Sequence, residues 1–208
     1  MKKYFILISI LLVMSCVYSQ SYTTIVNETF SSTPTGWTVI TSSSATWSRD
    51  TNYYLSSPSS YKGNVPSSSS AGDTVVLISP IFDLSQYPYV FLRFSHICKV
   101  SIADKCQISI KENYTGSQWH AIPASCYLGS ANNYSKERKF SDDSYNDWRS
   151  DSLWLQPTNG WWKTENFDIT SEANYAPVQF KFTITKGSTV GTEFAAGWFI
   201  DNFELFAS

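Results

Sequence analysis

The feature that most constrains this chain is its rhythm of short apolar stretches separated by clusters of Ser, Asn, Pro and Gly. No stretch of ten or more residues repeats its apolar side chains with the period of a helix. The clearest strand pattern runs over residues 89–100, where apolar residues recur at every second position and both faces carry some of them. Many short strands joined by turns predict an all-β sandwich or barrel.

Ten strands are expected from this pattern. They cover residues 22–30, 37–40, 45–47, 74–78, 89–100, 106–111, 119–122, 161–167, 178–185 and 197–206. Residues 56–72 and 129–152 are rich in polar and turn-forming residues, and they predict two long surface loops.

Composition excludes several classes of protein. Aromatic residues make up 16% of the 208 residues and charged residues only 15%, which disfavours both a helical bundle and a disordered chain. The formal net charge is −2 and no basic stripe is visible, so nucleic acid is not an expected partner. The length suits a single domain, and we expect it to span residues 22–208.

The first residues form a different kind of sequence. Lys2 and Lys3 precede an apolar run over residues 4–14, and small and polar residues follow to residue 20. This order predicts a signal peptide over residues 1–19, and the apolar run is too short for a membrane span. The expected location is extracellular or at the cell surface. Cys16, at the end of the apolar run, leaves open a lipid anchor instead.

Three cysteines remain after removal of this leader: Cys98, Cys106 and Cys126. An oxidising compartment permits one disulfide and leaves one thiol unpaired. A predicted hairpin turn at residues 102–104 would let Cys98 and Cys106 face each other across two strands. Their pairing stays open at this point, and their spacing matches no zinc pattern.

Several segments, taken in order, resemble the MAM-type jelly rolls of bacterial secreted proteins, which include the accessory domain of immune inhibitor A peptidases and the cleaved-adhesin domains of Bacteroidetes. The resemblance rests on residues 27–30, 36–37, 77–85, 92–96, 116, 119, 161–170 and, above all, 197–205. It implies a secreted jelly-roll β-sandwich of two antiparallel sheets, and says little about molecular function. Residues 126–160 have no counterpart in it, and the peptidase motif His-Glu-x-x-His is absent from the sequence.

The same resemblance implies a structural calcium ion between the first and last strands. Glu28, Asp201 and Asn202 occupy the corresponding positions and offer the oxygen ligands that Ca²⁺ prefers. The alternative is that these side chains lie at the surface or bind loop amides.

Catalysis is not expected. His96 stands beside Ser95 on a predicted strand, where neighbouring side chains point to opposite faces, so the two cannot form a nucleophile–base pair. His120 has no better-placed partner, and the acidic residues Asp142, Asp143 and Asp147 fall in a polar loop where solvation is expected.

Tryptophans provide the candidate ligand site. Trp148, Trp154 and Trp162 lie in or next to the second polar loop, and exposed aromatic rings bind the C–H faces of sugars. The alternative is ordinary packing beneath the loop, which is expected for Trp37, Trp47, Trp119 and Trp198.

These observations predict a secreted or cell-surface, non-catalytic binding or adhesion module that contacts an extracellular protein or a glycan. Two alternatives remain: a carbohydrate-binding protein that uses the loop tryptophans, and a stand-alone accessory domain that assists a separate secreted peptidase or glycosidase.

Overall fold

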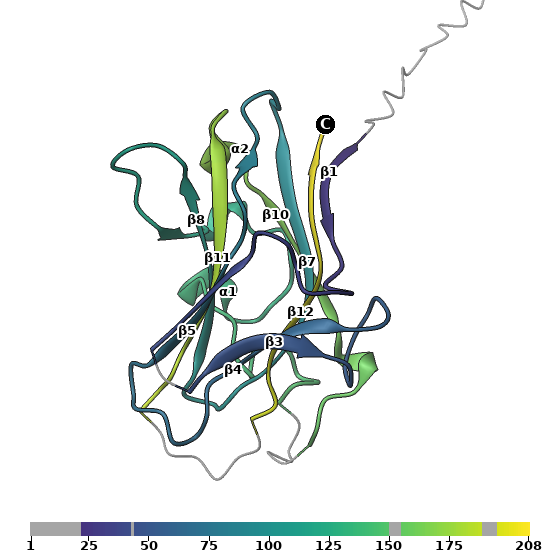
Figure 1. Ribbon diagram of the computed structural model, residues 1–208, viewed down its shortest axis with the longest axis vertical. Coiled ribbons are helices and arrows are strands. Elements are labelled where there is room, and N and C mark those ends of the chain that lie inside the picture. The colour runs from purple at the N-terminus through teal and green to yellow at the C-terminus, as the bar shows by residue number, and fades with distance from the viewer. Residues whose placement is uncertain (1–21, 43, 150–154, 189–194) are drawn as a thin grey trace, which may run out of the picture.

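The computed structural model describes residues 22–208 except 43, 150–154 and 189–194. The described chain forms two antiparallel β-sheets packed face to face (Figure 1), which confirms the predicted jelly-roll sandwich. The predicted signal peptide and Cys16 lie outside the described residues. The strands are β1 (Thr23–Glu28), β2 (Thr38–Thr41), β3 (Thr46–Asp50), β4 (Ser60–Asn64), β5 (Thr74–Ile78), β6 (Phe82–Asp83), β7 (Val90–Lys99), β8 (Lys105–Glu112), β9 (His120–Ala121), β10 (Lys163–Asp168), β11 (Pro177–Thr185) and β12 (Gly197–Ala207).

Sheet A has the strand order β10-β7-β12-β4-β3, with β1 also paired to β12. Strand β12 runs beside β7 along nearly its whole length, but on its other edge it changes partner. Its first part pairs with β4 and its second part with β1. The change occurs at a bulge between Asp201 and Glu204, where Asn202 has a φ of 48°. Figure 1 shows β1, β12 and β7 side by side above the crossing strands β3 and β4.

Sheet B has the order β2-β5-β11-β8-β9, with β6 also paired to β11. The single-turn helices α1 (Tyr134–Glu137) and α2 (Thr170–Ala173) and the 3₁₀ turns η1 (Ala124–Cys126) and η2 (Asn159–Trp161) lie in the connections. No helix in the described part of the chain is both long and apolar enough to cross a membrane.

Aromatic rings from both sheets contact one another in the core. Phe182 of sheet B packs edge-on against Phe94 of sheet A, with ring centroids 5.3 Å apart, and lies 5.5 Å from Trp198. Trp47 and Trp198 are buried, as the sequence predicts. Edge-to-face ring pairs add specific contacts to the burial of apolar area, so they fix how the two sheets are aligned.

Two sequence-based predictions of local structure are wrong. Residues 56–72 are not one continuous surface loop, because residues 60–64 form β4 inside sheet A. Residues 98–106 do not form a hairpin, because β7 belongs to sheet A and β8 to sheet B. Local sequence shows where a strand ends, but pairing partners are decided by contacts distant in sequence.

Gly63 of β4 is closely packed by one side chain from each sheet. A Cβ atom added there would stand 2.7 Å from Trp47 and 2.7 Å from Ile184 of the opposite sheet. We therefore expect Gly63→Ala to lower the free energy of unfolding by about 1–3 kcal/mol, measured by urea denaturation. Gly160→Ala is the matched control, because its added Cβ meets no atom closer than 3.6 Å. Equal unfolding midpoints for the two variants would contradict this account of the packing.

Candidate ligand-binding groove

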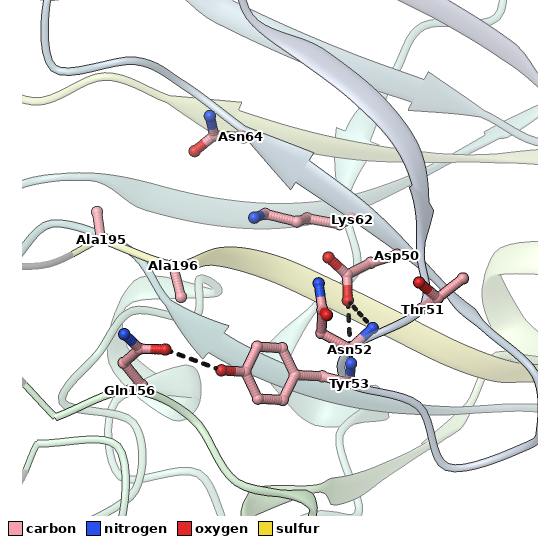
Figure 2. A pocket seen from close by; sticks show the side chains of 9 residues that line it. All are labelled: Asp50, Thr51, Asn52, Tyr53, Lys62, Asn64, Gln156, Ala195 and Ala196. Atoms are coloured by element: carbon pink, nitrogen blue, oxygen red, sulfur yellow. Dashed lines mark hydrogen bonds between the residues drawn. The ribbon is translucent and has the colours of Figure 1, made fainter.

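A groove of about 740 Å³ lies beside β3 and β4 (Figure 2). Its lining is polar except for one aromatic ring and two small apolar side chains, and it comes from four separate parts of the chain. The lining residues are Asp50, Thr51, Asn52, Tyr53, Lys62, Asn64, Gln156, Ala195 and Ala196.

The alternation of β4 places two polar side chains in this groove. Tyr61 and Gly63 face the core, where both contact Trp47. Lys62 and Asn64 consequently point to the opposite, outer face of sheet A, because successive side chains of a strand alternate. The Nζ atom of Lys62 lies 5.2 Å from the ring centroid of Phe199, and none of the described carboxylates forms an ion pair with it.

The turn after β3 supplies the next part of the lining. The Oδ1 atom of Asp50 accepts hydrogen bonds from the backbone N–H of Asn52 at 2.9 Å and of Tyr53 at 3.0 Å. The Tyr53 ring packs edge-on against Phe199 at 5.2 Å, and its hydroxyl donates to Oε1 of Gln156 at 3.2 Å. Figure 2 shows this hydroxyl reaching across to the glutamine. The aromatic ring is thus held in place at both ends.

Asp201 fixes the segment that follows this turn. Its Oδ2 atom accepts hydrogen bonds from the backbone N–H groups of Leu55 and Ser56, both at 2.8 Å, and its Oδ1 atom accepts one from Asn202 at 2.8 Å. The Ser56 hydroxyl donates to Oδ1 of Asn202 at 2.6 Å. A fully buried carboxylate of the bulge in β12 therefore ties down the segment that carries Asn52 and Tyr53.

The pKa of the Asp201 carboxyl reflects two opposing effects. Burial raises it, the three backbone hydrogen bonds lower it, and the charge of Glu28 raises it further. The net direction is upward, so burial outweighs the hydrogen bonds.

The predicted calcium site has its strands in the expected place, because β1 and β12 do pair. However, its oxygen atoms already accept hydrogen bonds: those of Asp201 and Asn202 as above, and Oε1 of Glu28 from the N–H of Phe30 at 2.7 Å. No group of three or more His, Cys, Asp or Glu side chains in the described residues could hold a metal ion. This donor set fits calcium poorly, and calcium stays a prediction.

A second polar cluster lies inside the sandwich, around His96 of β7. Glu165 of β10 is fully buried and accepts three hydrogen bonds, from His96 at 2.9 Å, Tyr145 at 2.8 Å and Tyr127 at 2.5 Å. The Nδ1 atom of His96 faces the indole N–H of Trp198 at 3.0 Å. Because an indole only donates, Nδ1 is the acceptor, and His96 is the neutral ring with its hydrogen on Nε2.

These contacts set the ionisation of the cluster. Burial alone would raise the pKa of Glu165, but its hydrogen bond and electrostatic interaction with His96, followed by the hydrogen bonds from Tyr127 and Tyr145, outweigh burial, and the pKa lies below its ordinary value of 4.5. Burial raises the pKa of Tyr145 to about 12, and the charge of Glu165 acts in the same direction. An ionised carboxylate with neutral donors is therefore the state that holds this cluster together.

Through Tyr127 and Tyr145, the cluster fastens the segment 126–148 to the sandwich. The segment also forms one bridge to β10 and one to β8. Trp148 lies fully buried there, its carbonyl accepts a hydrogen bond from Nζ of Lys99 at 3.0 Å, and its indole N–H donates to the carbonyl of Trp161 at 2.9 Å. The prediction of a sugar-stacking ring at Trp148 is therefore wrong, because both the ring and its N–H are used in packing. The hydrogen bond from Trp148 to the carbonyl of Trp161 also joins the two ends of the segment that contains Gln156.

The other two predicted ligand-binding residues are Trp162 and Trp154. Trp162 is half-buried and packs against the core, and Trp154 lies outside the described residues. Asp142 is buried rather than solvated, whereas Asp147 is exposed and ion-paired with Lys163.

The candidate catalytic groups do not combine into a reactive arrangement. His96 is buried in the cluster of Glu165, and His120 pairs with Glu172 at 2.6 Å. Cys126 is nearly buried; burial, followed by the charge of Glu172, raises its thiol pKa, which keeps the thiol in its unreactive protonated form.

None of the groove residues was predicted from the sequence as a site. One signal was readable: Asp50-Thr51-Asn52 has the composition of a turn in which an aspartate accepts a backbone hydrogen bond. Lys62 and Asn64 gave no signal, because their segment was assigned to a loop, and Gln156 is brought to the groove only by tertiary contacts.

No family model matches the chain, and no curated protein matches it in sequence. Similar solved structures include the CBM22-2 xylan-binding domain of Paenibacillus barcinonensis Xyn10C, with 11% identity, 88% of this chain and 99% of that chain covered, and a TM-score of 0.47. The K1 cleaved-adhesin domain of Lys-gingipain from Porphyromonas gingivalis has 12% identity, 91% and 99% coverage, and a TM-score of 0.48.

A third structure, a carbohydrate-binding module of the β-sandwich superfamily, has 12% identity and a TM-score of 0.50. The match covers 82% of this chain and 56% of that chain, so this chain corresponds to about half of that structure. At this level of identity the similarity shows the β-sandwich fold alone.

Glu165 generates a prediction about pH. Because its pKa is lower in the folded protein than in the unfolded chain, its ionised form stabilises the fold above about pH 4.5, and this contribution is lost as pH falls through the folded-state pKa. We expect Glu165→Gln to be less stable than the parent near pH 7, with the gap narrowing towards pH 3, in urea titrations at several pH values. Glu137→Gln, at an exposed ion pair with Lys105, controls for loss of a carboxylate. A gap that does not change with pH would contradict this role.

Asp201 generates a second prediction. Asparagine has one acceptor oxygen where aspartate has two, so it cannot accept all three backbone hydrogen bonds. We therefore expect Asp201→Asn to lower the free energy of unfolding by about 1–3 kcal/mol, both in buffer with calcium and in buffer with EDTA. The control is Asp83→Asn, an exposed carboxylate whose hydrogen bonds come from the neighbouring Ser85. Thermal melts of the parent in EDTA test the calcium prediction at the same time: a lower melting temperature that added Ca²⁺ restores would confirm the ion, and an unchanged one would exclude it.

Proposed function

We propose that this chain is a non-catalytic binding domain that acts outside the cytoplasm and holds a neutral saccharide in the groove beside β3 and β4. The observation that carries the proposal is the unused hydrogen-bonding capacity of the groove. The side-chain amides of Asn52 and Asn64 line it, and neither makes a hydrogen bond to any described residue.

The chemistry of the lining suits sugars. Each sugar hydroxyl both donates and accepts, and a carboxamide offers both functions within one side chain. Lys62 adds donors at one wall and Gln156 an amide at another. The Tyr53 ring supplies an aromatic surface of the kind that contacts sugar C–H groups, and the volume of the groove falls within the common range for ligand sites, about 300–1,000 Å³.

The charge balance favours a neutral ligand. Asp50 and Lys62 are the charged side chains of the lining, and they have opposite signs. Neither a histidine nor a cysteine is among the lining residues, so the groove offers the means to bind and orient a polyol rather than an activated nucleophile. The β-sandwich fold shared with carbohydrate-binding modules is compatible with this use and does not by itself establish it.

Binding to soluble neutral polysaccharides tests the proposal. We expect xylan, mannan or β-1,4-galactan to retard the protein in affinity electrophoresis, and the double variant Asn52→Ala/Asn64→Ala to weaken the interaction about tenfold, since two hydrogen-bonding groups are lost. Asn113→Ala, an exposed asparagine just after β8 in sheet B, is the matched control.

Two results would overturn the proposal. The first is an absence of binding across a panel of neutral glycans combined with saturable binding to a protein receptor, which would support adhesion to protein. The second is glycan binding that the double variant leaves unchanged, which would place the site elsewhere on the molecule.

A further inference from the structure

Cys98 and Cys106 lie on opposite sheets and face each other through the core. Cys98 belongs to β7 in sheet A and Cys106 to β8 in sheet B, and both side chains are fully buried. Both are free thiols in this structure, and both project between the sheets. Cys98 pairs across its sheet with the buried Trp198, and Cys106 pairs with Ile184, whose side chain reaches Gly63 of sheet A. The Cys106 thiol interacts with that of Cys98. The contact therefore joins two sheets rather than two strands of one hairpin.

The neighbours of the two cysteines show the same approach. Cys98 pairs across its sheet with Trp198, and Cys106 forms an isolated bridge with Phe140. The Trp198 and Phe140 rings in turn contact each other, with centroids 6.4 Å apart. Both thiols therefore lie in the packed part of the core around Trp198 and Phe140.

The segment between the cysteines is held at several points. Nζ of Lys99 donates to the carbonyl of Trp148, and the N–H of Asp104 donates to the carbonyl of Ser101 at 2.8 Å. The Oδ1 atom of Asp104 accepts from the N–H of Gly187 at 2.9 Å. A crossover fixed in this way keeps the two thiols in register with each other.

We propose that Cys98 and Cys106 form a disulfide that ties sheet A to sheet B in the secreted protein. Two S–H bonds break and one S–S bond forms. The two electrons and two protons pass to an external disulfide oxidant, a small-molecule or protein disulfide, which is cleaved to two thiols. Cys126 stays a free thiol, because its sulfur lies beside the hydroxyl of Ser171 at 4.0 Å, away from this pair.

Peptide mapping tests the disulfide directly. The full chain is expressed in a secreting host, denatured, alkylated with iodoacetamide without reduction and digested with trypsin, which cleaves after Arg93, Lys99, Lys105 and Lys111. We expect the peptides 94–99 and 106–111 to appear joined, two hydrogens lighter than their sum, and to separate after reduction. The peptide 112–136, which carries Cys126, should be alkylated without reduction.

Thermal melting provides the second measurement. We expect a reductant to lower the melting temperature of the parent by about 5 °C or more, because the closed loop no longer restricts the unfolded chain. Cys98→Ala should melt at the same temperature with and without the reductant, whereas the control Cys126→Ala should keep the parent's sensitivity.

Full alkylation of both cysteines before reduction, or a cross-link that includes Cys126, would overturn the proposal. This test is independent of the proposed glycan site, because glycan binding is tested with the Asn52→Ala/Asn64→Ala variant and the disulfide by peptide mapping.

Discussion

The bulge in β12 and the buried carboxylate at its start determine the arrangement of this molecule more than any other feature. At this point β12 leaves β4 and takes β1 as its neighbour, while β7 remains beside it throughout. Asp201, at the start of the bulge, accepts hydrogen bonds from two backbone amides of the segment after β3 and from one amide of its own strand. The polar groove rests on that segment, so a core residue that touches no ligand positions the surface proposed to bind one.

The two polar clusters of the protein differ in how fully their hydrogen bonds are used. Around Glu165 each carboxylate oxygen has its donors and the histidine ring is used on both nitrogen atoms. Burying such a cluster costs free energy unless all its hydrogen bonds are made, and only one arrangement of the side chains makes them all. This suits its role of fastening a long loop to a sheet. In the groove, by contrast, the side-chain amides of Asn52 and Asn64 make no hydrogen bond to any described residue, and unused capacity of this kind is what a ligand can recognise.

The strands and their faces were largely readable from the sequence. The alternation of β7 and the dense apolar strands β5 and β11 follow from local patterning, because the side-chain period of two reports burial directly. The burial of Trp47 and Trp198 followed from the same rule. The burial of Trp148 could not be predicted in this way. A tryptophan in a polar segment gives the same sequence pattern whether the segment is solvated or packs over the core. The hydrogen-bond partners that bury Trp148, the Nζ atom of Lys99 and the carbonyl of Trp161, are distant in sequence.

The sequence by itself determined that the chain is an all-β sandwich, where most of its strands lie, and that its first and last strands have acidic residues at matching positions. Only the tertiary structure decided that Asp201 binds loop amides, that Cys98 and Cys106 meet across two sheets, and that Asn64 and Gln156 share a groove. The physical reason is the range of the interactions. Strand formation and burial depend on periodic local pattern, whereas strand partners, sheet membership and convergent side chains depend on contacts between segments as much as 146 residues apart.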